Sequence, residues 1–175
     1  GFSLQRLDAN PILANPRYGG AAMGDDPARF GPPPTAADPL VSTMVESLHG
    51  TNLWWMVRRL SGSEPVVAGG KAALVTSRHT SAGLPLRNGL EMARERFLAL
   101  GLQVSMLAWS NAGYTGSNLV ATLPGSLRSN ELVLVTAHFD DMPLGALAPG
   151  ADDNASGSAA VLAAAGVFCQ YRFDR

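Results

Sequence analysis

The sequence is poor in cysteine and in charge, and it has no apolar run long enough to span a membrane. Its one cysteine, Cys169, excludes an internal disulfide framework, and the apolar helical pattern around it favours a small buried side chain over a reactive thiol. Charged residues make up 15% of the chain, and the formal net charge is −1. Because no basic stripe is present, nucleic acid is not expected as a partner.

The first residue, Gly1, is neither an initiator methionine nor the start of a signal peptide. The N-terminus is therefore expected to be processed or clipped, which leaves the location open. A parent protein that is secreted, periplasmic or membrane-anchored agrees with the sequence. The oligomeric state is equally open.

What the sequence does have is enough apolar content, 46% of 175 residues, for one domain with a core. Residues 1–38 are rich in glycine and proline and are predicted to form an irregular arm, and residues 39–175 to form the N-terminal part of an α/β domain. Apolar spacing predicts helices over 39–60 (interrupted near Gly50), 84–100 and 156–170, and strands over 102–109, 118–123 and 131–137. The expected fold is a mixed, mainly parallel sheet flanked by helices.

Residues that suit a metal site follow the apolar run at 131–137. His138 supplies an imidazole nitrogen that can bind Zn²⁺ at ~2.0–2.1 Å. Asp140 lies two residues on, so in an extended chain it points the same way as His138. A carboxylate in that position can accept the other ring N–H and orient the ring, so Asp140 is predicted to support the metal ligand.

A second acid, Asp153, follows His138 after a loop rich in proline and glycine. Such a loop can turn back and bring one carboxylate beside the imidazole, where its two oxygens can bridge two metal ions ~3.5–4 Å apart. Each motif alone also fits a plainer interpretation, a hydrogen-bonded surface pair at 138–140 and a helix cap at 152–157. The metal interpretation depends on their occurring together and in this order.

Three stretches carry a family resemblance: Thr-Ala-His-Phe-Asp at 136–140, Ala-Pro-Gly-Ala-Asp-Asp-Asn-Ala-Ser-Gly at 148–157, and Asn-Leu-Val-Ala-Thr-Leu-Pro-Gly at 118–125. Together they resemble the co-catalytic zinc aminopeptidases of the bacterial leucyl aminopeptidase and aminopeptidase Y type. The similarity is strong over about residues 115–170, weaker over 40–114 and absent from the arm.

The resemblance implies a zinc exopeptidase-like fold, two zinc ions in the complete enzyme, and a peptide substrate cleaved at its amino terminus. It implies that His138 binds one zinc, that Asp153 bridges both, and that Asp140 supports His138. Asp152 is then a neighbour of the bridging ligand and not itself a ligand.

In one respect the sequence departs from the family pattern. The family's next strand leads to a Glu-Glu pair, a general base followed by a zinc ligand, and a later acid and histidine complete the metal shells; none of these is present by Arg175. The chain is therefore expected to be a C-terminally truncated fragment that is inactive alone. Four alternatives stay open: a glutaminyl cyclase of this fold, a carboxypeptidase or amidohydrolase of the same clan, a non-catalytic peptidase-like ectodomain, and an unrelated binding module.

Two further motifs have both a structural and a functional interpretation. Trp54-Trp55 is expected to be core plus a partly exposed neighbour rather than a binding surface. The segment Arg78-His79-Thr80-Ser81 could reach the rim of the site, but a structural arginine with loop hydrogen bonds is favoured.

Overall fold

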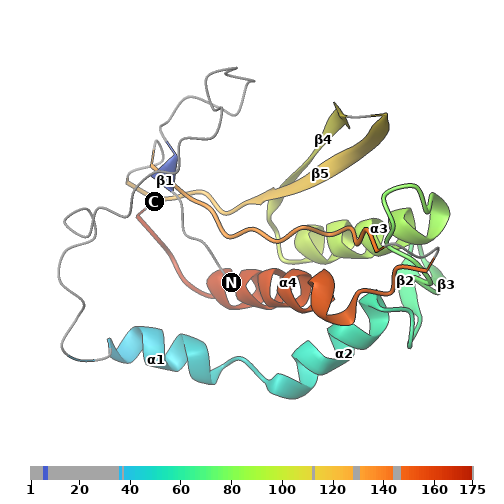
Figure 1. Cartoon of the computed structure of the whole chain (residues 1–175). Helices are drawn as coiled ribbons and strands as arrows, with labels where there is room; N and C mark the ends of the chain where they lie inside the picture. The colour runs from blue at the N-terminus through green and yellow to red at the C-terminus, as the bar shows by residue number, and fades with distance from the viewer. Residues whose placement is uncertain are drawn as a thin grey trace.

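The computed structural model describes residues 6–7, 36, 38–111, 113–127, 131–143 and 147–174. In these ranges the helices are α1 (Pro39–Glu46), α2 (Gly50–Leu60), α3 (Leu84–Ala99), the π-helical turn η2 (Ala151–Ala155) and α4 (Ser156–Phe168). The strands are β1 (Arg6–Leu7), β2 (Val66–Ala68), β3 (Lys71–Ala73), β4 (Gln103–Asn111), β5 (Tyr114–Thr122) and β6 (Leu132–Val133) (Figure 1). The chain thus combines helices and strands, as predicted. The division at residue 38 stays a prediction, since most of the arm lies outside the described residues.

The first two helices begin as the sequence predicts. Asp38 Oδ1 accepts hydrogen bonds from the main-chain N–H groups of Leu40 (2.7 Å) and Val41 (3.3 Å), which caps α1. Pro39 takes the first helical position, where its missing N–H costs nothing. The predicted interruption falls just before Gly50, where α2 begins. Of the helices in the described ranges, none is both long and apolar enough to cross a membrane.

The strands pair in a different way from the expected sheet. Within the described residues every ladder is two-stranded and antiparallel: β1 with β6, β2 with β3, and β4 with β5. The β2–β3 hairpin turns at Gly69 and Gly70, whose φ angles of +57° and +72° suit a tight hairpin turn, and sequence reasoning missed it. The predicted strand over 131–137 is paired only at Leu132–Val133. The mainly parallel sheet therefore stays a prediction.

The core lies where α4 packs between α2 and α3 (Figure 1). Its buried residues are Met56, Leu60, Ala93, Phe97, Leu102, Ala155, Ala159 and Leu162. Full burial of a leucine such as Leu60 contributes about 1.5–3 kcal/mol. Cys169 packs against the same cluster but is only partly buried, so the prediction of a buried side chain holds in part; desolvation raises the pKa of its thiol. This packing fixes the N-terminus of α4, directly after Asp153.

The prediction for the tryptophan pair is wrong. Both rings are exposed, Trp54 to 52% and Trp55 to 40%, because Met56 and Leu60 form the buried face of α2. The rings contact each other edge to face, with centroids 4.8 Å apart. The Arg58 guanidinium carbon lies 4.7 Å from the centroid of the Trp54 ring, a cation–π distance.

Candidate metal centre

The chain after β6 is held in place by Phe139. This side chain packs against the core cluster, and its ring lies so close to Gly89 of α3 that a Cβ on Gly89 would be 3.2 Å from it. Its neighbours in the sequence stay accessible: the side chains of His138 and Asp140 are 55% and 37% exposed. Packing of one aromatic side chain therefore presents the two flanking polar residues at the surface.

The loop that leads to Asp153 folds back tightly at Gly150. Gly150 has a φ of +46°, in the left-handed region that favours glycine. A Cβ there would collide with the carbonyl oxygen of Asp153 and with the side chains of Asp141 and Arg78. The sequence prediction of a returning loop is confirmed at this end; Gly145, which contributed to it, lies outside the described residues.

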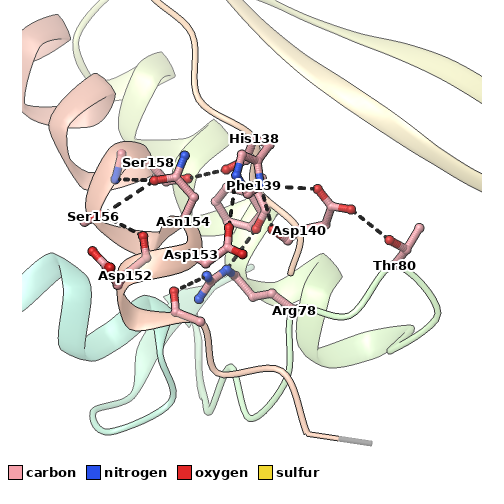
Figure 2. Close-up of polar contacts among 12 residues, drawn as sticks. Arg78, Thr80, His138, Phe139, Asp140, Asp152, Asp153, Asn154, Ser156 and Ser158 are labelled. Atoms are coloured by element: carbon pink, nitrogen blue, oxygen red, sulfur yellow. Dashed lines mark hydrogen bonds and ion pairs between the residues drawn. The ribbon is translucent and has the colours of Figure 1, made fainter. Parts of the chain in front are cut away.

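The two predicted metal ligands meet in the structure. His138 Nε2 lies 3.1 Å from Asp153 Oδ1, and the two side chains are 55% and 74% exposed. Figure 2 shows the Asp153 carboxylate directed at the imidazole, while the Asp152 side chain points away from it. His138, in the extended segment after β6, and Asp153, in the loop before α4, thus form one site, which opens to solvent.

The other ring nitrogen identifies the tautomer. His138 Nδ1 lies 2.9 Å from the main-chain carbonyl oxygen of Asp140, and a carbonyl only accepts, so Nδ1 carries the proton. In the neutral ring, Nε2 then presents a lone pair to the Asp153 carboxylate, and two acceptors face each other. A positive charge between them, either a proton on Nε2 or a bound metal ion, resolves this contact. Two donors ~2.0–2.1 Å from one tetrahedral zinc lie roughly 3.3 Å apart, close to the separation observed.

Asp140 contacts His138 through a different group from the one predicted. The main-chain carbonyl accepts the ring N–H, whereas the carboxylate oxygen Oδ1 is 3.8 Å from Nδ1, beyond hydrogen-bond distance. The carboxylate is held instead by Thr80, whose hydroxyl donates to Asp140 Oδ2 at 2.8 Å (Figure 2). Sequence reasoning singled out the segment around Thr80 but not this contact.

Arg78 joins the segments that form the site. Its side chain is fully buried and donates to the carbonyl oxygens of Phe139 (2.8 Å), Pro149 (2.7 Å) and Gly150 (2.7 Å), and also to that of Leu60 at the end of α2. Burial lowers the pKa of Arg78, and the charges of nearby aspartates oppose that shift. The prediction of a structural arginine is confirmed.

The start of α4 connects Asp153 to the rest of the site. Asn154, joined to Asp153 by a cis peptide bond, accepts the main-chain N–H of Gly157 on Oδ1 at 2.9 Å and caps the helix. A Cβ on Gly157 would collide with the Asn154 side chain, so the glycine permits the close approach. Within the stretch 152–157, where the sequence suggests a helix cap, the cap is thus Asn154 and not Ser156, whose hydroxyl donates to the Asp152 carbonyl oxygen at 3.0 Å.

Beyond this pair, the described residues contain no group of three or more histidine, cysteine, aspartate or glutamate side chains that could hold a metal ion. The site as described therefore offers two ligand atoms, His138 Nε2 and Asp153 Oδ1, with Asp140 behind the imidazole.

The part of the chain that forms the site is similar to known proteins. Residues 118–175 match the model of peptidase family M28. The resemblance to the co-catalytic zinc aminopeptidases is thereby confirmed for the C-terminal part, which holds His138, Asp140 and Asp153.

Individual relatives match over the same kind of short segment. A probable leucine aminopeptidase of Trichophyton verrucosum is 53% identical over 51 residues, which are 27% of this chain and 13% of that protein. Leucine aminopeptidase 1 of Trichophyton equinum is 51% identical over 51 residues, with the same two shares. The leupeptin-inactivating enzyme 1 of Streptomyces exfoliatus is 33% identical over 84 residues, 48% of this chain and 18% of that enzyme. The chain thus spans less than a fifth of each of these relatives, and no solved structure matches it significantly.

Proposed function

We propose that this chain is the N-terminal part of the catalytic domain of a zinc-dependent aminopeptidase. The observation that carries the proposal is the contact between His138 Nε2 and Asp153 Oδ1 at 3.1 Å, with the Nδ1 proton already used by the Asp140 carbonyl. The M28 match covers all three residues, and relatives matched over short segments are named leucine aminopeptidases. The proposal includes the family's mainly parallel, helix-flanked sheet.

The donor set fits zinc. Imidazole nitrogen and carboxylate oxygen are ordinary zinc ligands, and their spacing suits a shared tetrahedral ion. When bound, zinc polarises the scissile carbonyl and activates water as the nucleophile. His138 and Asp153 would hold the ion, and the second oxygen of the exposed Asp153 carboxylate would be available to a second one. Asp140 keeps the imidazole in the tautomer that leaves Nε2 free.

The same residues explain why this chain alone is expected to lack activity. A catalytic zinc ion usually takes three protein ligands, and the attacking water needs a general base. After Asp153 the sequence holds one further acid, Asp174, and no histidine. The remaining ligands and the glutamate base are therefore assigned to a longer protein that acts on peptides with a free amino terminus.

Hydrolysis of a leucyl chromogenic amide with added Zn²⁺ tests this proposal at two lengths. The 175-residue chain is expected to show no turnover. A protein of the relatives' length that contains this segment is expected to show chelator-sensitive turnover, abolished by His138→Ala or Asp153→Ala and retained by Asp152→Ala. Zinc-dependent turnover by the short chain that Asp153→Ala removes would overturn the assignment of the missing groups. Full turnover by the long Asp153→Ala variant would overturn the site itself.

A further inference from the structure

We propose that Thr80 is a positioning residue of this site, which acts on His138 through Asp140; the inference rests on the proposed zinc function. The contact that carries it is the hydrogen bond from Thr80 Oγ1 to Asp140 Oδ2 at 2.8 Å, between residues sixty positions apart in the sequence. Charge-assisted hydrogen bonds of this kind are stronger than neutral ones, so the carboxylate is held firmly on one oxygen.

The donor lies two residues after Arg78, which makes further hydrogen bonds to the same segment as Asp140. The buried Arg78 side chain donates to the Phe139 carbonyl oxygen at 2.8 Å, and its main-chain carbonyl accepts the N–H of Asp141 at 3.0 Å. With the Thr80 contact, three hydrogen bonds therefore join segment 78–80 to segment 139–141. Asp140 is the central residue of segment 139–141. Figure 2 shows the Thr80 side chain on the side of Asp140 opposite His138.

Holding Asp140 determines what His138 contacts. Asp140 offers Nδ1 a carbonyl oxygen at 2.9 Å and a carboxylate oxygen, Oδ1, at 3.8 Å. The hydrogen bond from Thr80 to Oδ2 restrains rotation of the carboxylate, so the main-chain carbonyl keeps its place as the acceptor of the ring N–H. Without the Thr80 hydroxyl, the partly exposed carboxylate is released to turn toward solvent or toward the ring. Either movement changes the orientation of the imidazole and hence the position of Nε2 opposite Asp153.

A comparison of Thr80→Val with Thr80→Ser tests the inference on the 175-residue chain. Valine keeps the shape of threonine but removes the donor, whereas serine keeps the donor. The first measurement needs no metal: the ¹⁵N shifts of the His138 ring at about pH 8, where an ordinary histidine is neutral, report which nitrogen carries the proton. The second measurement is the Kd for Zn²⁺, obtained by titrating the chain with Zn²⁺ and monitoring the same ¹⁵N signals of the His138 ring. Thr43→Val is the matched control, because it also removes a hydroxyl hydrogen bond, to Pro39 on α1 at 2.9 Å.

Thr80→Val is expected to lose the preference for Nδ1–H and to raise the Kd for Zn²⁺ about tenfold, the lower end of the usual cost of losing a partner behind a metal ligand. Thr80→Ser and Thr43→Val should match the wild type, and Thr80→Val should add nothing to Asp140→Ala. Wild-type ring signals in Thr80→Val, or equal defects in Thr80→Ser and Thr80→Val, would overturn the inference. If the wild type itself shows no response to Zn²⁺, the proposed function fails, while the metal-free tautomer comparison still decides the role of Thr80.

Discussion

At the scale of single residues, Arg78 does most to join the segment that carries His138 to the loop that carries Asp153. A buried guanidinium is costly to desolvate, and this one is compensated by carbonyl oxygens at Leu60, Phe139, Pro149 and Gly150. Those carbonyls belong to the end of α2, to the residue after His138 and to the loop before Asp153. Arg78 therefore holds the segments of the site in place through main-chain carbonyl oxygens, without a hydrogen bond to the side chain of His138 or Asp153.

Replacing Arg78 by methionine should lower the free energy of unfolding by at least about 3 kcal/mol. Four carbonyl oxygens, one buried and three partly buried, lose a charged donor, and each such hydrogen bond contributes about 1.5–3 kcal/mol. Urea denaturation of Arg78→Met measures the loss. Arg94→Met is the control, because the exposed Arg94–Glu91 pair should contribute no more than about 0.5 kcal/mol. Equal small losses in both variants would show that Arg78 does not hold the loops.

At the scale of elements, sequence patterns predicted what depends on local spacing. The helix over 84–100 is found at Leu84–Ala99 and the interruption of the first helical segment at Gly50, because apolar periodicity and capping residues act within a few positions. The β2–β3 hairpin was missed although Gly69-Gly70 signals one, because its strands are only three residues long. The prediction that the Trp pair contributes to the core was wrong, because helical periodicity does not tell which face of a helix packs against the rest of the molecule.

The contact between α3 and Phe139 gives a prediction at this scale. Gly89→Ala should lower the free energy of unfolding by about 1 kcal/mol, since the added methyl presses on Phe139 and costs more than the helix gains. Gly50→Ala in α2 is the matched control: its Cβ meets nothing within 4 Å, so the substitution should stabilise by about 0.4–1 kcal/mol. Thermal unfolding compares the two. Equal stabilisation by both would mean that Phe139 is not packed tightly on α3.

At the scale of the whole molecule, the site joins segments that are distant in the sequence. The local motifs predicted that His138 and Asp153 converge, because a returning loop is visible in the sequence. The contributions of Thr80 and Arg78 depend on tertiary packing across sixty residues or more, which no local pattern specifies. The sheet is the least predictable part, since strand pairing depends on partners far along the chain.

Exposed apolar surface leads to a prediction for the isolated chain. No residue of α1 is buried, and Leu40, Val41 and Val45 are each more than half exposed. We expect the chain to bind a hydrophobic dye and to self-associate, because a patch of this kind favours contact over hydration. Val41→Lys with Val45→Lys should reduce both effects, as measured by dye fluorescence and light scattering. A monodisperse wild-type monomer that binds no dye would contradict this expectation.

The central claim is that His138 and Asp153 bind the same zinc ion, and a zinc titration followed through the ring nitrogens of His138 tests it most directly. In the wild-type chain and in the Asp152→Ala control, millimolar Zn²⁺ should shift Nε2 while Nδ1 keeps its proton. In Asp153→Ala the response should require at least about tenfold more Zn²⁺, because one ligand oxygen is lost. A His138 Nε2 signal that ignores Zn²⁺ in the wild type, or that responds equally well without the Asp153 carboxylate, would contradict the claim.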